Sequence, residues 1–108
     1  MRIIIFGGHG FIGSAVAEKY REIGYEDVFQ LSRSDNVDLM DLDGTAKVIQ
    51  KLSPDIVVNC TAYVGSVHYG MGHPAEIINV NTLMTLNLYK AIEISKLNIS
   101  VINPISNC

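Results

Sequence analysis

Three glycines near the start of the sequence have the spacing of a turn that holds a phosphate group. Gly7, Gly10 and Gly13 follow the apolar run 2–6 and precede apolar residues at helical spacing. In such a turn the first glycine makes the tight bend, the second lets a pyrophosphate approach the backbone, and the third lets the helix pack closely against the strand. The N–H groups at the start of the helix then face the phosphates. We therefore expect a dinucleotide site formed by Gly7, Gly8, His9, Gly10, Phe11, Ile12 and Gly13.

Two other interpretations of this glycine turn predict different functions. A nucleoside triphosphate loop of the Walker type is excluded, because no Gly-Lys-Ser or Gly-Lys-Thr follows the glycines. A strand-to-helix turn that binds nothing stays open as the alternative. The apolar strand before the glycines and the amphipathic helix after them favour the dinucleotide site.

The stretch 31–35 (Leu-Ser-Arg-Ser-Asp) follows the second expected strand, where dinucleotide-binding proteins distinguish NAD from NADP. An acid at this position holds the ribose hydroxyls of NAD, whereas a cation accommodates the 2′-phosphate of NADP. Arg33 lies between two serines and could hold that phosphate through charge-assisted hydrogen bonds. Asp35 comes later than the usual acid. We expect NADP as the cofactor, and the alternatives are NAD held by Asp35 or an arginine that contacts only solvent.

The histidines and cysteines do not have the spacing of a metal site. His9, His68 and His73 are dispersed through two loops that contain glycine, without a pair four residues apart on a helix. Cys60 and Cys108 are 48 positions apart, which does not indicate a disulfide framework. We expect His9 beside the cofactor phosphates, whereas the other two histidines either border a substrate or are exposed. No metal site is expected.

The composition restricts the class of protein and its partners. The chain has 108 residues, of which 48% are hydrophobic and 18% charged, and its formal net charge is −3. Such a chain can bury a core, and it has no surplus of basic residues for a nucleic-acid backbone. No apolar run reaches the about 18–20 residues that span a bilayer, and the N-terminus lacks a signal sequence. We expect a cytoplasmic protein with reduced thiols that binds neither nucleic acid nor a membrane.

Strands and helices alternate along the sequence. Short runs rich in β-branched residues predict strands at 2–6, 28–31, 37–39, 55–60 and 99–102. Apolar residues at helical spacing predict helices at 12–23, at 43–52 with Asp43 as its N-cap, and at about 75–97. This alternation predicts an α/β fold, a Rossmann-type doubly wound parallel sheet, over residues 1–108. No closing helix follows the last strand, so we expect a domain truncated after the fifth strand and lacking a substrate-binding C-terminal region.

The spacing Gly-x-x-Gly-x-x-Gly resembles the short-chain dehydrogenase/reductase superfamily, in particular its extended branch, the NAD-dependent epimerase/dehydratase family. Two further segments resemble the same branch. Asp41-Leu42 is similar to the acidic-apolar pair that family members place against the adenine ring. The segment 59–62 is similar to the Asn-x-x-Ala at the end of the fourth strand, where the backbone borders the ribose. The resemblance therefore adds four residues to the expected cofactor site: Asp41, Leu42, Thr61 and Ala62.

Within this branch the sequence most resembles the GDP-L-fucose synthase family. Residues 61–67 are similar to its Ala-Ala-Lys-Val-Gly-Gly-Ile segment, residues 73–76 with Asn81 and Asn87 fall at its spacing, and residues 104–108 are similar to its Gly-Ser-Ser-Cys. The chain departs from the family at three positions, with Tyr63 for lysine, His9 for arginine and Asn107 for serine. The resemblance implies an NADP(H)-dependent epimerase/reductase that acts on a nucleotide-diphospho-sugar, of the GDP-4-keto-6-deoxymannose to GDP-L-fucose type. A dTDP-4-dehydrorhamnose reductase, to which residues 51–59 are similar, is the alternative.

The resemblance also implies catalytic roles at the end of the chain. Ser106 matches the family serine that binds the sugar carbonyl, and Cys108 matches the cysteine that acts as an acid and base in epimerisation. The family's Tyr-x-x-x-Lys pair does not occur in the chain. We expect that pair beyond residue 108 and expect this chain alone to be inactive. The alternative function is a non-catalytic dinucleotide-binding module.

The long helix carries two apolar stripes. One stripe is expected to face the sheet and consists of Ile77, Val80, Met84, Leu88 and Ala91. The second consists of Leu83, Leu86, Ile94 and Leu97, which a monomer would leave exposed. Because members of the extended branch pair through this helix, the resemblance implies a homodimer. The alternative is that further C-terminal residues cover the second stripe.

Overall fold

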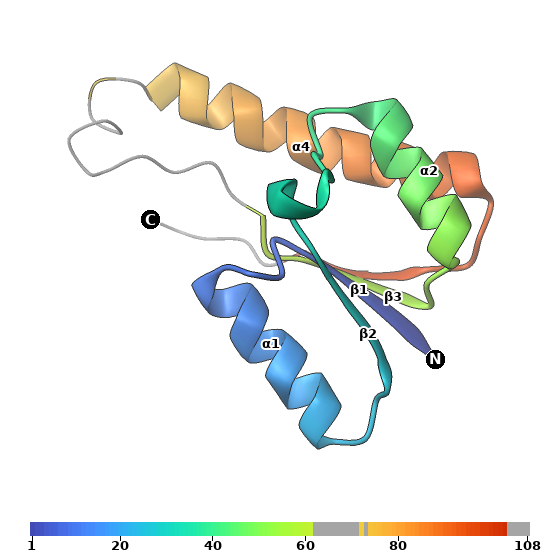
Figure 1. Cartoon of the computed structure of the whole chain (residues 1–108). Helices are drawn as coiled ribbons and strands as arrows, with labels where there is room; N and C mark the ends of the chain where they lie inside the picture. The colour runs from blue at the N-terminus through green and yellow to red at the C-terminus, as the bar shows by residue number, and fades with distance from the viewer. Residues whose placement is uncertain (62–71, 73, 104–108) are drawn as a thin grey trace.

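A parallel sheet forms the centre of the protein in this computed structural model, which describes residues 1–61, 72 and 74–103 (Figure 1). Its four strands in the described part are β1 (Arg2–Phe6), β2 (Asp27–Leu31), β3 (Ile56–Asn59) and β4 (Ser100–Ile102). Their order across the sheet is β2-β1-β3-β4, and every neighbouring pair is parallel. The chain thus moves from β1 to one side for β2 and returns to the other side for β3. The predicted Rossmann-type α/β sheet is confirmed.

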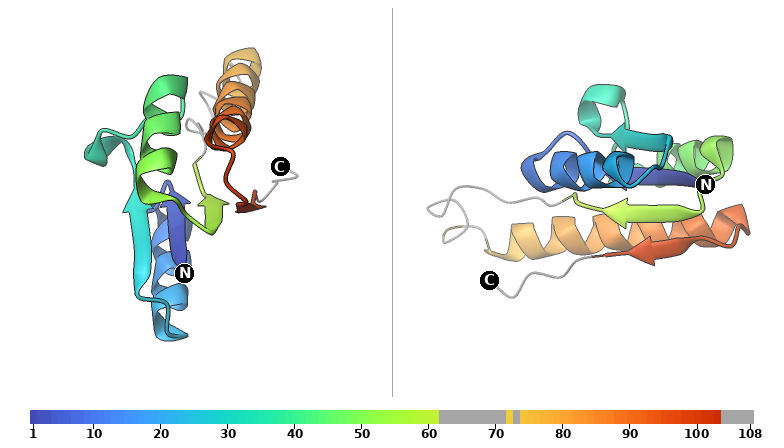
Figure 2. Two further views of the ribbon diagram at one scale, coloured as in Figure 1. Left: turned by 90° about the vertical axis from the view of Figure 1, so that its right-hand side faces the viewer. Right: turned by 90° about the horizontal axis from the view of Figure 1, so that it is seen from below.

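Helices cover both faces of the sheet (Figure 2). Helix α1 (Phe11–Glu22) lies on one face, and α2 (Leu42–Leu52) and α4 (Pro74–Ser95) pack together on the other. A single 3-10 turn, η1 (Arg33–Asp35), follows β2. None of the described helices is long and apolar enough to cross a membrane.

The central strand β1 explains why the two layers of helices form. Successive side chains of a strand point to opposite faces, so its apolar run supplies both cores at once. Ile3 and Ile5 pack with Ala17 of α1, whereas Ile4 and Phe6 pack with the residues of α2 and α4. All four β1 side chains are at most 1% exposed. The carboxyl end of β1 therefore lies between the two layers of helices.

The predicted strand at 37–39 is wrong, because this segment forms turns and irregular backbone. The Leu39 side chain is buried against α2 and α4 at 2% exposure, which explains its apolar character. Its carbonyl oxygen accepts a hydrogen bond of 2.8 Å from the Asn87 Nδ2 of α4 instead of a bond from a neighbouring strand. The segment is therefore apolar because an irregular loop packs its side chains into the core, and not because it forms a strand.

The start of the second helix also differs from the prediction. The N-cap of α2 is Asp41, whose carboxylate accepts a hydrogen bond of 3.2 Å from the Gly44 N–H, and Asp43 lies in the first turn. Both aspartates satisfy the sequence preference for an N-cap. Asp41 takes the position because its backbone is extended, with φ −102° and ψ 100°, and the helix begins at the next residue.

Candidate functional site

A cavity of about 430 Å³ lies at the carboxyl edge of the sheet. In an open parallel sheet this edge binds ligands where neighbouring connections run to opposite sides, as they do here from β1. The cavity is lined by Phe6, Gly7, Gly10, Leu31, Ser32, Arg33, Ser34, Val37, Asp38, Leu39, Cys60, Thr61 and Met84. Residues from the ends of β1, β2 and β3 therefore meet around one space.

Three glycines of the turn are required by the fold itself. A Cβ on Gly8 would lie 2.6 Å from the Cα of Gln30. Gly7 has φ +71°, and a Cβ there would lie 2.7 Å from the backbone carbonyl carbon of Cys60. A Cβ on Gly13 would overlap the carbonyl oxygen of Gly7 and would lie 2.8 Å from the Cα of Gly8. Gly7 and Gly8 let the turn lie against the neighbouring strands, and Gly13 lets α1 start directly against the turn. Their presence alone does not indicate a ligand.

Gly10 has no such structural requirement. A Cβ there would meet only the carbonyl oxygen of Gly7 at 3.5 Å, an ordinary contact, and its φ of −76° suits any residue. Gly10 lines the cavity and is the N-cap of α1, and among the described residues no side chain caps the first turn of that helix. The space beside Gly10 and the uncapped N–H groups fit a phosphate group that approaches the backbone.

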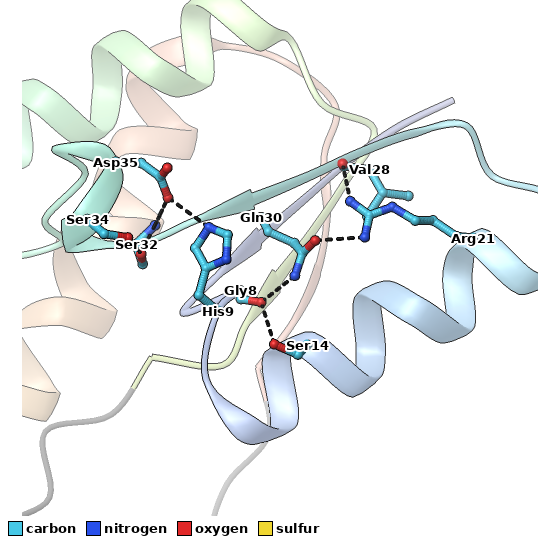
Figure 3. Close-up of polar contacts among 9 residues, drawn as sticks. All are labelled: Gly8, His9, Ser14, Arg21, Val28, Gln30, Ser32, Ser34 and Asp35. Carbon is cyan, nitrogen blue, oxygen red and sulfur yellow. Dashed lines mark hydrogen bonds and ion pairs between the residues drawn. The ribbon is translucent and has the colours of Figure 1, made fainter.

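The Gly8 carbonyl oxygen is held by side chains from α1 and β2 (Figure 3). It accepts hydrogen bonds from Gln30 Nε2 at 2.7 Å and from Ser14 Oγ at 3.3 Å. Arg21 in turn donates to Gln30 Oε1 at 2.7 Å and to the Val28 carbonyl oxygen at 3.1 Å. This network fixes the glycine turn to the second strand. Sequence reasoning missed it, since the three side chains follow no recognisable spacing.

Arg33 lies where the sequence predicted it, at the cavity and beside two serines. Its side chain is exposed and forms no hydrogen bond or ion pair with the residues that the structure describes. The hydroxyls of Ser32 and Ser34 are 2.7 Å apart. A guanidinium group without a partner beside two hydroxyls is a suitable site for a phosphate monoester.

His9 and Asp35 form a contact that the sequence did not indicate. His9 Nε2 lies 3.1 Å from Asp35 Oδ2, and Figure 3 shows the imidazole of the glycine turn pointing toward η1. The same carboxylate oxygen accepts the Ser32 N–H at 3.0 Å and the Ser32 hydroxyl at 3.3 Å. The predicted cofactor residue His9 is thus near the cavity, and it is paired with the predicted alternative acid.

The expected adenine pair Asp41-Leu42 does not line the cavity. Asp41 instead caps α2, and the residues at the cavity three positions earlier are Asp38 and Leu39. Both pairs have the same acidic-apolar pattern, so the sequence alone does not distinguish them. Of the two pairs, Asp38-Leu39 lines the cavity, and a contact of Asp41-Leu42 with an adenine ring stays a prediction.

The remaining predicted residues lie at different distances from the cavity. Thr61 lines it, and its N–H donates a hydrogen bond of 3.0 Å to Asn59 Oδ1. Phe11 and Ile12, at the start of α1, are 94% and 63% exposed and are not part of the lining. Five residues singled out in the sequence lie outside the described residues, namely Ala62, His68, His73, Ser106 and Cys108.

Cys60 lines the cavity beside the end of β3 and is partly buried. Burial raises the pKa of the Cys60 thiol above its ordinary value, because an apolar environment disfavours the thiolate. The side chain therefore stays protonated near neutral pH and acts as a small apolar wall of the cavity.

Curated relatives match almost the whole chain but only part of their own length. A GDP-L-fucose synthase from Azorhizobium caulinodans is 26% identical over 107 residues, which are 99% of this chain and 33% of that protein. A GDP-6-deoxy-D-talose 4-dehydrogenase from Aggregatibacter actinomycetemcomitans is 30% identical over 92 residues, 85% of this chain and 30% of that protein. This chain thus spans about a third of the length of these relatives.

Solved structures have the same fold. The UDP-glucose 4-epimerase of Thermus thermophilus, determined with NAD, matches with a TM-score of 0.76 and 29% identity over 90% of this chain and 35% of that one. A GDP-mannoheptose C4 reductase from Campylobacter jejuni, determined with NADP, matches with a TM-score of 0.82 and 19% identity over 94% of this chain and 32% of that one. The model of the NAD dependent epimerase/dehydratase family matches residues 3–108. The chain belongs to the NAD dependent epimerase/dehydratase family.

Proposed function

We propose that this chain binds a nicotinamide dinucleotide, NADP(H) in preference to NAD(H), in the cavity at the carboxyl edge of β1, β2 and β3. The observation that carries the proposal is Gly10, a glycine that no part of the described chain requires but that opens the cavity to the uncapped start of α1. The family description and the epimerase determined with NAD support a nicotinamide dinucleotide.

The residues at the cavity divide into groups suited to different parts of such a cofactor. The first turn of α1 and Gly10 suit the pyrophosphate. Arg33, with the hydroxyls of Ser32 and Ser34, suits a 2′-phosphate, and the segment Asp38-Leu39 suits the adenosine end. When bound, the cofactor supplies or accepts a hydride, while the chain binds and orients it.

We propose further that the chain is the cofactor-binding part of a nucleotide-diphospho-sugar epimerase/reductase. Two relatives named for enzymes of GDP-sugars support this class, and the resemblance to GDP-L-fucose synthases favours the GDP-4-keto-6-deoxymannose to GDP-L-fucose reaction. Ser106 would then bind the sugar carbonyl and Cys108 would act as acid and base. These two roles rest on the sequence resemblance alone.

Binding of the cofactor tests the proposal directly. We expect NADPH to bind the 108-residue chain saturably, and its fluorescence change should be reversed by excess adenosine 2′,5′-bisphosphate. Ala15→Val is the control variant, because it adds bulk at an exposed position of α1 that does not line the cavity and should leave the titration unchanged. The absence of saturable binding by both NADPH and NADH would overturn the proposal.

We also propose that a second copy of the chain covers the second apolar stripe of α4. Leu83, Leu86 and Ile94 are 40%, 49% and 57% exposed. Leu97, the fourth residue of the predicted stripe, lies beyond the end of α4 at Ser95 and is half-buried. Complete burial of such side chains contributes about 1.5–3 kcal/mol each, before the cost of association.

Light scattering at micromolar concentration should therefore give the mass of a dimer, and Leu86→Glu should reduce it to that of a monomer. Ile78→Glu is the control, since Ile78 is 64% exposed on another side of the same helix and should leave the dimer intact. A monomeric mass for the unsubstituted chain would refute this assembly.

A further inference from the structure

The irregular segment 37–39 forms one wall of the cavity, and side chains of two helices hold its backbone. Val37, Asp38 and Leu39 all line the cavity. Asn87 of α4 donates a hydrogen bond of 2.8 Å from Nδ2 to the Leu39 carbonyl oxygen and is only 6% exposed. Asn87 does not line the cavity itself. A polar group inside the core therefore holds the wall of the cavity.

Asn87 lies on an otherwise apolar face of α4. Met84, Leu88 and Ala91 share this face at helical spacing, are at most 3% exposed and belong to the core. A buried amide costs free energy unless its hydrogen bonds are formed, so packing alone would favour an apolar side chain at position 87. The bond to the Leu39 carbonyl oxygen explains why an amide is present here. The group that this bond holds is part of the cavity wall.

Thr45 of α2 holds the same segment from a second helix. Its side chain is completely buried. Its Oγ1 donates a hydrogen bond of 2.8 Å to the Asp41 carbonyl oxygen and lies 3.3 Å from the Asp38 carbonyl oxygen. The Asp38 carbonyl oxygen also accepts the Asp41 N–H at 2.9 Å. Helices α2 and α4, which pack together, thus each bind backbone carbonyl groups of the segment that leads into α2.

Both polar groups of the peptide between Leu39 and Met40 have partners. Asn87 binds its carbonyl oxygen, and the Met40 N–H donates a hydrogen bond of 2.9 Å to Asp38 Oδ1. Because the Leu39 side chain is 2% exposed, it anchors the segment in the core whether or not the amide is present. Without the amide, the carbonyl oxygen would lack a partner inside the core. Such a group turns toward water, which is found here in the cavity.

We propose that Asn87 is a positioning residue for the nucleoside end of the cofactor, because it keeps the Leu39 carbonyl oxygen directed at α4 and leaves the wall free to receive the base. The inference rests on the proposed function, since it concerns the same cavity. Asn87 acts through the backbone of Leu39 and contacts no ligand. It gives α4 a part in ligand binding in addition to its packing against α2.

Displacement of the bound reduced cofactor, NADPH or NADH, from the whole 108-residue chain tests the inference. The competitors are ADP and UDP, which share the ribose and the diphosphate and differ in the base. The measured quantity is the ratio of their affinities, which reports the contact between the base and the wall. A loss of folded protein lowers both apparent affinities by the same factor and leaves this ratio unchanged.

We expect the unsubstituted chain to prefer ADP, and Asn87→Leu to lower this preference about fivefold, the effect of one hydrogen bond. Leucine branches at the same carbon as asparagine and suits the apolar face, so the variant should fold, which circular dichroism can verify. Ile49→Val is the control. It shortens a completely buried side chain of α2 that does not line the cavity, so it should lower the urea midpoint without changing the ratio.

Thr45 offers an independent pair of variants, which decides the question if Asn87→Leu does not fold. Thr45→Val has the same shape but no hydroxyl group, and it should lower the preference for ADP about twofold to threefold. Thr45→Ser keeps the hydroxyl group and should keep the preference, although the loss of a buried methyl group lowers its stability.

The outcomes separate this inference from the proposed function. Equal affinities of the unsubstituted chain for ADP and UDP overturn the inference, and so does a folded Asn87→Leu variant that keeps the full preference. If that variant does not fold, a full preference in Thr45→Val has the same meaning. An equal loss in Ile49→Val also overturns the inference, because the effect would then follow from stability. In each of these cases displacement of the cofactor by ADP still upholds the cavity as the nucleotide site. Failure of both NADPH and NADH to bind overturns the proposed function and the inference together.

Discussion

Gly10→Val is expected to lower the affinity for NADPH about a hundredfold without unfolding the chain, since two charge-assisted hydrogen bonds of about 1.5 kcal/mol each would be lost. A Cβ at position 10 meets only the Gly7 carbonyl oxygen, at 3.5 Å, and the φ of −76° suits a valine, so we expect the backbone to keep its conformation. It instead fills the part of the cavity beside the first turn of α1, where a phosphate would lie. Fluorescence titration measures the affinity, and urea denaturation followed by circular dichroism measures the stability.

Gly13→Val provides the contrast. Its Cβ would overlap the Gly7 carbonyl oxygen and would lie 2.8 Å from the Cα of Gly8, and both are backbone atoms, which cannot move aside as a flexible side chain can. We expect a loss of more than about 4 kcal/mol in the free energy of unfolding, a large part of the stability of a small domain. A Gly10→Val variant that binds NADPH as tightly as the unsubstituted chain would show that the glycine turn is not the phosphate site.

The unsubstituted chain is expected to bind NADPH at least about tenfold more tightly than NADH, and Arg33→Ala should make the two affinities equal. The reason is that the Arg33 guanidinium lines the cavity without any partner among the described residues, beside the paired hydroxyls of Ser32 and Ser34. Because no interaction within the described structure is broken, the stability should change by no more than about 0.5 kcal/mol.

Lys47→Ala is the matched control for Arg33→Ala. It removes the same formal charge from an exposed position of α2 that does not line the cavity, so the preference for NADPH should persist. Fluorescence titrations with both reduced cofactors measure the preference. Equal affinities in the unsubstituted chain would contradict the role of Arg33, and Asp35 would become the residue that selects NAD.

The sequence by itself was sufficient to predict the four strands of the described sheet, its three long helices and the glycine turn at its carboxyl edge. The apolar run Ile3–Phe6 of β1 indicates burial on both faces of the sheet. The three glycines indicate a turn from a strand to a helix. Arg33 was identified because cofactor selection depends on its place after the second strand. All these features are local, since each depends on residues within one strand, one turn or one helix.

Local patterns were insufficient wherever two segments satisfied the same preference. Asp38-Leu39 and Asp41-Leu42 have the same acidic-apolar pattern, and only the structure shows that the first pair lines the cavity and that Asp41 caps α2. Likewise, the apolar residues at 37–39 predicted a strand. In the structure the Leu39 carbonyl oxygen is instead bound by Asn87, 48 residues later in the chain. Burial is visible in a sequence pattern, but the hydrogen-bonding partner of a buried backbone group is not.

The contacts that define the rim of the cavity were decided by the tertiary structure alone. His9 meets Asp35 across 26 residues, and Gln30 holds the Gly8 carbonyl oxygen across 22. Both contacts depend on the register of β1 and β2, in which Phe6 lies beside Leu31. That register follows from how two strands and α1 pack together, because shifting a strand by one residue would turn every side chain to the other face of the sheet. The sequence therefore determines the residue types at positions 9, 30 and 35, but the contacts that these residues form depend on the pairing of β1 with β2.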